Sequence, residues 1–237
     1  MASDEPATVE LVASLRAEHP HSRLWPVLLD ALNHQDPEYR PWGSGELFPE
    51  GLTSPDAHQP AALLASWWHD YTHTDEDDDN RTPDQRLAVT APFGRSWPGL
   101  AQSGHQRCDP DQLANEYTTA LLTRRPWLRL GLIAASSGAA ALTTAGWQGP
   151  LNYANDTAVF SAVLRDWEHR FGARVVCAGF STLLLSVAAP PADRDASLAI
   201  AAEHFAFCPD NVWQGPGNLT VYADQLIDAH EWGFWWD

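Results

Sequence analysis

The segment Asp156–Ala189, DTAVFSAVLRDWEHRFGARVVCAGFSTLLLSVAA, predicts one helix followed by two strands. Asp156 is suited to cap the start of the helix, and Gly172 is suited to end it. The apolar runs Arg174–Gly179 and Leu183–Ala189 lie only a few residues apart, so we expect them to pair as an antiparallel hairpin. The buried face of the helix is expected to carry the apolar residues that recur at intervals of three and four: Phe160, Val163, Leu164, Trp167 and Phe171.

Two more helices and a last strand follow this segment. The helices are expected over Asp193–Phe207, which stops before Pro209, and over Asn218–Ala229, each with a capping residue at its first position. Side chains alternate along the last strand, Glu231–Trp236, so one face can be buried while the other exposes Trp235. The face expected in the core carries Trp232, Phe234 and Trp236.

The chain upstream of this segment is less regular. Pro26 indicates that a strand over Leu24–Leu29 lies at a sheet edge, because proline lacks the N–H that a central strand needs. Two stretches are expected to be loops: Asn33–Pro60, which is rich in proline, glycine and aspartate, and Pro92–Pro110. The remaining elements are helices over Val9–Ala17, Ala61–Tyr71, Pro110–Thr123 and Ser136–Ala145, and strands over Leu87–Ala91 and Trp127–Ala134.

Helices and strands are mixed along the chain without strict alternation, which favours an α+β fold. We expect a mixed sheet of about four to six strands, flanked by helices. Most of the expected loop lies early in the chain. The sequence therefore predicts a loop-rich N-terminal extension over residues 1–108 and a C-terminal α+β domain over residues 109–237.

The strong negative charge limits the kinds of partner. The net charge is −17 at neutral pH, from 31 acidic residues against 14 basic ones. Nucleic acids and anionic membranes are therefore excluded as partners, since both are bound through clustered cations. A basic protein is the partner that this charge favours. The N-terminal residues MASDEPATVE lack the pattern of a signal peptide, so we expect a cytoplasmic location.

The residues that are missing exclude several kinds of enzyme. The chain contains no lysine, which excludes Schiff-base chemistry, pyridoxal-phosphate chemistry, P-loop NTPases and protein kinases. It also lacks the motifs GxGxxG, GxSxG, HExxH and CxxC. We therefore favour a protein that is not an enzyme.

Neither a metal nor a cofactor is expected. The three cysteines are odd in number and lie far apart, which argues against a disulfide framework and against a zinc motif. His69 and His73 lie four residues apart and precede the acidic run Asp75–Asp79. That run does not match a calcium-binding loop, because Asn80 stands where glycine is required. We expect the run to be a solvated loop.

Three separated motifs indicate a family. They are Tyr153–Val176 (YANDTAVFSAVLRDWEHRFGARVV), Ala201–Gln214 (AAEHFAFCPDNVWQ) and Glu231–Asp237 (EWGFWWD), preceded by the strand–helix segment Arg129–Trp147. In content and order they resemble the bacterial family catalogued as domain of unknown function 4253, over roughly the last 110 residues. The resemblance implies a domain in this region, and it brings no catalytic residue, cofactor or activity.

Polar residues near the helix start at Asp156 are the first candidates for function. Asn152 and Asn155 could hold a ligand at the helix N-terminus, where N–H groups favour an anion. The simpler interpretation is that these residues form a turn and that Asp156 caps the helix. On the same helix, Arg165 and Glu168 lie away from the apolar stripe, either on a solvated face or on a face that binds protein.

A second group of candidates follows residue 202. His204 and Cys208 are four residues apart on one helix face, as a general base and a nucleophile could be. Cys208 would lie at the C-terminal end of that helix, where the partial negative charge disfavours a thiolate. A structural role is therefore favoured for both residues. The other candidates in this group are Glu203, Asp210 and Asn211, with Trp213 and Trp235 as residues that could line a pocket or an interface.

These observations leave more than one function open. The favoured hypothesis is a non-enzymatic, acidic protein-binding module, for example an immunity-type protein that neutralises a basic partner. The alternative is a small-molecule enzyme or ligand-binding domain with a polar cleft around Glu203, His204, Asp210 and Asn211. A third hypothesis is an accessory domain whose N-terminal extension mediates oligomerisation.

Overall fold

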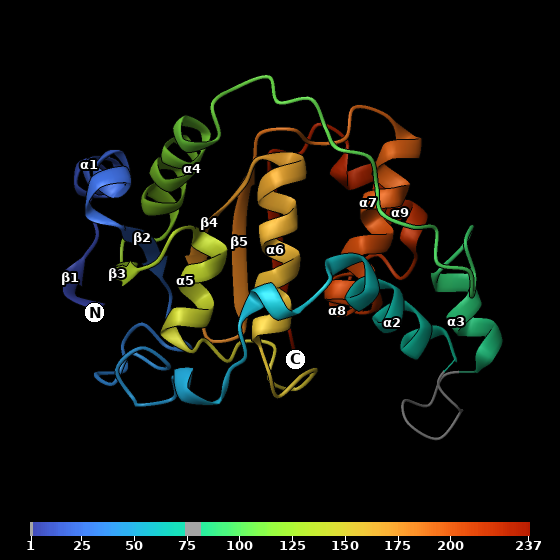
Figure 1. Cartoon of the computed structure of the whole chain (residues 1–237), viewed down its shortest axis with the longest axis horizontal. Coiled ribbons are helices and arrows are strands. Elements are labelled where there is room, and N and C mark those ends of the chain that lie inside the picture. The colour runs from blue at the N-terminus through green and yellow to red at the C-terminus, as the bar shows by residue number, and fades with distance from the viewer. Residues whose placement is uncertain (1, 74–81) are drawn as a thin grey trace. The chain divides into compact units, whose positions relative to one another are not determined.

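The computed structural model describes residues 2–73 and 82–237 (Figure 1). The acidic run that the sequence places at residues 75–79 lies outside the described residues, so its solvation stays a prediction. The chain divides into two compact units, which we call the sheet unit and the helical unit. The sheet unit comprises Met1–His58, His105–Ala189 and His230–Asp237, and the helical unit comprises Gln59–Gly104 and Pro190–Ala229.

A six-stranded mixed sheet forms the centre of the sheet unit, in the order β1-β3-β2-β4-β5-β6. Strands β2 and β4 are parallel, and the other neighbouring strands are antiparallel. The predicted α+β class and the predicted hairpin of β4 and β5 are therefore confirmed. The strands are β1 (Ala2–Pro6), β2 (Leu24–Leu29), β3 (Arg129–Ala134), β4 (Ala173–Ala178), β5 (Thr182–Val187) and β6 (Glu231–Trp235).

The prediction that Pro26 marks an edge strand is wrong. Strand β2 lies inside the sheet, between β3 and β4. Pro26 pairs with Leu132 of β3, whereas the parallel strand β4 pairs with β2 only at Leu28 and Leu29. On the β4 side, Pro26 therefore lies outside the ladder, where its missing N–H costs nothing.

Helices cover both faces of this sheet. Helices α1 (Val9–Ser22) and α4 (Pro110–Arg124) share a core with Leu28, Leu130 and Val176. Helices α5 (Gly138–Ala145) and α6 (Ala158–Phe171) cover the opposite face, and in Figure 1 they lie in front of β4 and β5. The sheet unit is therefore a three-layered α/β/α arrangement.

The last strand packs as its alternation predicts. Trp232, Phe234 and Trp236 are buried, and Trp235 is 37% exposed. Trp167 of α6 stacks on Phe234 with ring centroids 5.5 Å apart, and it meets Trp232 edge-on at 5.6 Å. Stacked and edge-on aromatic pairs add stability beyond the area that they bury. The terminal strand is therefore held by α6.

The start of α6 differs by one residue from the expectation. Thr157 occupies the N-cap position, and its side chain makes no capping bond. Asp156 still contributes, because its Oδ1 accepts a hydrogen bond from the N–H of Ala158 at 3.1 Å. Thr53 also donates to Asp156 through its N–H, at 3.3 Å, which ties the loop before α2 to the start of α6.

The helical unit is built around aromatic side chains. Trp68 of α2 is fully buried and meets Phe205 of α7 edge-on, with ring centroids 5.6 Å apart. Phe93 and Trp97, from the loop that follows α3, contact the same indole ring. The helices are α2 (Pro60–His73), α3 (Pro83–Val89), α7 (Arg194–Phe207), α8 (Asp210–Trp213) and α9 (Leu219–Leu226).

The expected strand over residues 87–91 is wrong, because most of it belongs to helix α3. Thr82 and Gln85 form a capping box, in which each side chain accepts a hydrogen bond from the backbone of the other, and Pro83 takes the first helical position. These local signals favour a helix over the strand that a short apolar run suggests. Asp210 and Asn211 form the start of the short helix α8.

The loop between β2 and α2 contains only two short 3-10 helices, η1 (Pro49–Gly51) and η2 (Pro55–Ala57). This matches the expected loop over residues 33–60. Within residues 2–73 and 82–237, no helix has both the length and the apolar character needed to cross a membrane.

Candidate functional site

Residues 39–48 form a loop that is anchored to the end of β2. The hydroxyl of Tyr39 donates a hydrogen bond to the carbonyl oxygen of Leu29 at 2.7 Å, and burial raises the pKa of Tyr39 to about 12. The indole N–H of Trp42 donates to the carbonyl oxygen of Asp30 at 2.7 Å. Asp30 is itself fixed by an ion pair with Arg125, at 2.9 Å. These contacts hold the loop in a defined position, so it acts as a wall although it contains no helix or strand.

This wall separates two hollows. Pro41, Glu46 and Phe48 line one of them, whereas the neighbouring residues Trp42 and Leu47 line the other. We call the first the loop pocket and the second the sheet-face cavity. The loop pocket has a volume of about 440 Å³ and is lined by residues 32, 41, 46, 48, 148–149, 151–152, 180–181 and 236–237.

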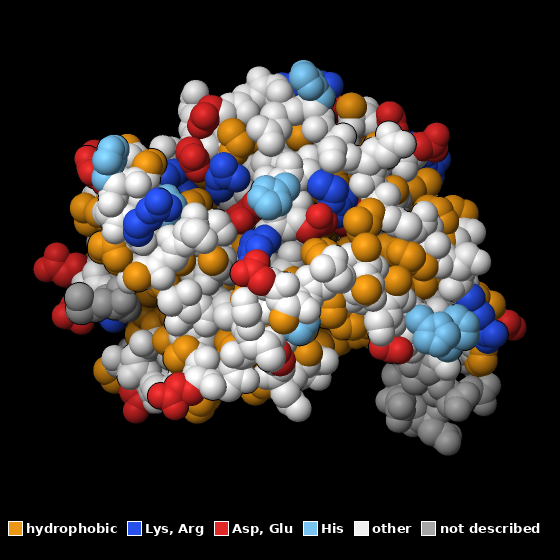
Figure 2. Space-filling model, in the orientation of Figure 1, with side chains coloured by type: hydrophobic (Ala, Val, Ile, Leu, Met, Phe, Trp, Pro, Cys, Tyr) orange, Lys and Arg blue, Asp and Glu red, His pale blue; other side chains and the backbone are white. Residues whose placement is uncertain are grey.

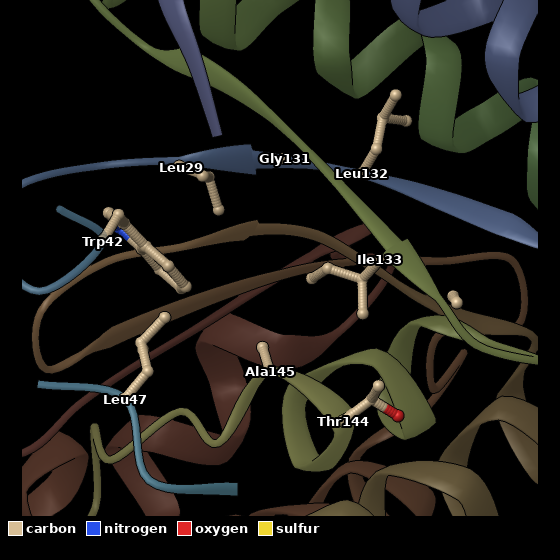
Figure 3. Close-up of a pocket in the computed structure, with 9 residues that line it drawn as sticks. Leu29, Trp42, Leu47, Gly131, Leu132, Ile133, Thr144 and Ala145 are labelled. Carbon is tan, nitrogen blue, oxygen red and sulfur yellow. The ribbon is translucent and has the colours of Figure 1, made fainter. Parts of the chain in front are cut away.

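Most of the side chains that line the sheet-face cavity are apolar (Figure 3). Leu29, Gly131 and Ile133 of the sheet line it, together with residues of the loop and of α5, and its volume is about 320 Å³. Its polar side chains are already paired: Thr144 donates to the carbonyl oxygen of Ala140 at 3.0 Å, and the Trp42 indole donates to Asp30. The side chains of this cavity therefore offer apolar surface and no charge.

The loop pocket combines aromatic walls with carboxyl groups. Phe48, Phe180 and Trp236 supply the rings, and Glu46 and Asp237 supply the acids. The pocket lies among loops that follow the carboxyl ends of β2 and β4. Such loops, held by a rigid sheet, are common places for binding sites.

Exposed apolar side chains surround the loop pocket. Leu32 is 59% exposed, Phe48 is 58% exposed and Leu151 is 44% exposed. All three line the pocket and come from two separate loops. Apolar side chains gathered in this way on a surface indicate a site of interaction, whereas single exposed ones need no explanation.

Arg40 already uses the acidic and aromatic groups of this pocket. Its guanidinium forms two hydrogen bonds with the carboxylate of Glu46, through Nε and, at 3.1 Å, through Nη2. Its Cζ atom lies 5.2 Å from the ring centroid of Phe180. The hydrogen bond from Arg40 lowers the pKa of Glu46 below its usual value. A guanidinium group is therefore complementary to this part of the pocket.

The surroundings of the loop pocket are strongly acidic. Residues 30–58 contain six acidic residues and one arginine. Figure 2 shows acidic side chains on the lower left of the molecule, over this loop. A cationic ligand is therefore attracted to this end of the sheet unit.

The structure places the candidates around α6 at separate positions. Asn152 is exposed and lines the loop pocket, whereas Asn155 is exposed and lies outside the pocket lining. Trp235 is partly exposed, on the strand face opposite Trp236. Of these three candidates, only Asn152 therefore joins the site.

Arg165 and Glu168 contribute to packing between elements of the sheet unit. Arg165 Nη2 lies 2.5 Å from Asp56 Oδ1 of η2. Glu168 Oε1 accepts the N–H of Ala139 at 3.0 Å, at the start of α5, and burial raises the pKa of Glu168. Figure 2 shows charges of both signs across the centre of the molecule, where α6 lies. The two residues connect α6 to its neighbours and do not converge on a ligand.

The second group of candidates lies in the core of the helical unit. Glu203 and His204 are fully buried, and Asp210 and Asn211 are 6% and 8% exposed. Glu203 accepts the N–H of Ala101 at 2.6 Å, and Gln214 donates to Asp210 at 3.2 Å. These side chains hold the chain in place, and a substrate would have to open the core to reach them.

Tyr222 was not among the predicted site residues, although it joins the residues of this core. Its hydroxyl lies 3.1 Å from Nδ1 of His204 and 3.1 Å from Nδ2 of Asn211. Cys208 donates to Oδ1 of Asn211 at 3.5 Å. Tyr222 could have been expected here from its place on the apolar face of α9, which also carries Leu219, Ala223 and Leu226.

Burial keeps this network uncharged. It lowers the pKa of His204 to about 3 and raises that of Tyr222 well above its usual range. Hydrogen bonds among these neutral groups help to fix the packing of the core. Trp213 belongs to the same core, since its ring meets Phe205 edge-on at 5.3 Å. Among the described residues, no three His, Cys, Asp or Glu side chains are placed to hold a metal ion.

The comparisons with known proteins identify one domain. Residues 129–237 match the family model described as "Domain of unknown function (DUF4253)", which confirms the resemblance carried by the three motifs. Curated proteins and solved structures gave no match. The matched residues include β3–β6 and contribute Asn152, Phe180 and Trp236 to the loop pocket, whose remaining wall comes from residues 32–48.

Proposed function

We propose that this protein is a non-enzymatic binding module that captures a basic partner protein through the loop pocket. The observation that carries the proposal is the exposed apolar rim of Leu32, Phe48 and Leu151 beside the carboxyl groups of Glu46 and Asp237. Such a surface suits a partner segment in which an apolar side chain is flanked by arginine or lysine.

The contact made by Arg40 suggests how a partner's cation would bind. The chain's own guanidinium lies over Phe180 and is held by Glu46. A second guanidinium from a partner would meet the same ring system and the nearby carboxyl group of Asp237. The apolar anchor of the partner would lie on the rim, where it removes the exposed side chains from water.

The charge of the whole chain supports the same kind of partner. A net charge of −17 accelerates encounter with a basic protein and makes the rate of binding sensitive to salt. An immunity-type protein that neutralises a basic toxin is a concrete version of this function. The acidic loop would then raise the rate at which the partner is encountered. The apolar rim would lengthen the lifetime of the complex.

A peptide probe tests the site directly. We would titrate a five-residue peptide, with leucine between two pairs of arginine, into the ¹⁵N-labelled full chain and follow the amide resonances. We expect shifts confined to residues 32–48, 148–152, 180–181 and 236–237, with a Kd on the order of 1 mM, as is usual for a short flexible peptide. Raising the salt to about 0.5 M should weaken the binding several-fold.

Matched variants sharpen this test. Glu46→Gln removes a pocket carboxylate and should weaken binding of the peptide, whereas Arg40→Gln releases Glu46 from its internal partner and should strengthen it. Glu116→Gln makes the same change on the exposed surface of α4 and should have no effect. The proposal fails if the arginine peptide binds no better than a peptide with glutamate in place of arginine, or if the shifts fall elsewhere.

A further inference from the structure

Arg16 is a buried cation that does not line the loop pocket. It lies on α1, is 5% exposed, and its Nε donates to Oδ1 of Asn115 on α4 at 3.0 Å. Among the described residues, neither Nη1 nor Nη2 of Arg16 has a hydrogen-bond acceptor, and both atoms are closed off from solvent. A buried guanidinium with unsatisfied N–H groups is costly, so it needs an acceptor.

The neighbouring indole lacks an acceptor as well. Trp25 of β2 is 4% exposed, and its ring centroid lies 5.5 Å from Cζ of Arg16. Its Nε1 is buried and has no hydrogen-bond partner within the described ranges. This part of the interior therefore contains three buried donor atoms that lack a protein acceptor.

The charge of Arg16 is poorly compensated by its surroundings. Asp111 is the negative charge that raises its pKa, but Asp111 is half exposed and pairs with Nε of Arg174 at 2.9 Å. Burial, with a smaller contribution from the positive charge of Arg174, lowers the pKa of Arg16 to about 10. Arg16 therefore remains protonated at neutral pH while it lacks a close counter-charge.

We propose that Arg16 and the indole N–H of Trp25 bind a small monovalent anion of the size of chloride, in the interior between α1, α4 and β2. A single negative charge balances the single uncompensated guanidinium, and the guanidinium fork with the indole supplies only donors. A phosphate would bring more negative charge toward Asp111. A phosphate is also larger than chloride, so α1 and α4 would have to move apart to make room for it.

Chloride is the probe for this site, and gluconate, an anion too bulky to enter it, is the reference. Thermal unfolding of the full chain would be followed while sodium chloride replaces sodium gluconate at constant ionic strength. Because a ligand stabilises the folded state that binds it, we expect the midpoint to rise by about 3–5 °C for each tenfold increase in chloride above its Kd. Crystals soaked in sodium bromide should show an anomalous peak beside Nη1 and Nη2 of Arg16.

Three variants decide the assignment. Arg16→Met removes the charge and should abolish the chloride dependence, whereas Arg124→Met removes an exposed arginine of α4 and should retain it. If Arg16→Met does not fold, Trp25→Phe decides, because it keeps the ring and removes the N–H donor, so the dependence on chloride should weaken. Equal midpoints in chloride and gluconate, together with no bromide peak, would overturn the proposal and assign the acceptor role to water.

Discussion

The backbone N–H of Phe48 donates a hydrogen bond to the carbonyl oxygen of Gly146, with the two atoms 2.9 Å apart. Gly146 is the C-cap of α5 and has a φ of 72°, in the left-handed region. The end of a helix in the family domain therefore holds the loop that separates the two hollows. The position of Phe48, on the rim of the loop pocket, depends on this contact.

The first prediction concerns Gly146→Ala. A Cβ at this position would lie 2.2 Å from the backbone nitrogen of Pro49, and its φ is unfavourable for alanine. We expect a loss of at least about 2 kcal/mol in the free energy of unfolding, measured with denaturant. Gly45→Ala is the matched control, because Gly45 has a φ of 78° and open space around it. Its cost should be about 1 kcal/mol, and equal costs would contradict the role given to Pro49.

The second prediction concerns the sheet-face cavity. Ala145 lines it and is labelled in Figure 3. Ala145→Leu places an apolar side chain in this space and should stabilise the chain by about 0.5–1 kcal/mol. Thermal unfolding measures the gain, and titration with the arginine peptide should give an unchanged Kd. A loss of stability would show that the cavity is too narrow for the added side chain.

Strand alternation was predictable because it depends only on the backbone of one segment. Trp232, Phe234 and Trp236 share a face in any strand of that register, and packing against α6 buries them. The misplaced strand at Pro26 has the opposite cause. Whether a strand lies at an edge depends on which distant strands pair with it, and β4 pairs with β2 only between Leu28 and Cys177 and between Leu29 and Ala178, far apart in the chain.

The loop pocket could largely not be predicted from the sequence, because it too depends on which distant segments meet in the fold. Its lining comes from four separate segments, and only Asn152 had been singled out. The acidic, proline-rich and glycine-rich composition of residues 33–60 predicts a loop, but not which loops it meets. In contrast, a structural role was favoured for His204 and Cys208, and both side chains are fully buried.

The third prediction tests the start of α3, which the sequence interpretation missed. Thr82→Ala removes the side-chain oxygen that accepts the N–H of Gln85, and it should destabilise α3 by about 1 kcal/mol. Hydrogen exchange of the α3 amides measures the loss locally. Thr119→Ala is the control, because its exposed hydroxyl only bonds back to the carbonyl oxygen of Asn115 within α4. That change should be neutral or slightly stabilising, and a similar loss at both sites would argue against the cap.

The last prediction concerns the pH dependence of the helical unit. Burial lowers the pKa of His204 to about 3, whereas histidine in an unfolded chain titrates near 6.5. Between these values the unfolded chain binds a proton that the folded chain refuses, so stability falls as the pH falls through this window. Lowering the pH from 7 to 4.5 should cost on the order of 2 kcal/mol through this residue.

Substitution at His204 and at its partner separates this effect from other titrations. His204→Gln keeps a hydrogen-bonding group near Tyr222 without a titrating ring, so the free energy of unfolding should fall less steeply between pH 6.5 and 4. Tyr222→Phe removes the hydroxyl and leaves the imidazole buried, so it should lower stability at every pH while keeping the steep slope. Denaturant titrations at several pH values measure both slopes. If His204→Gln and the unchanged protein had the same slope, His204 would not be held neutral by burial.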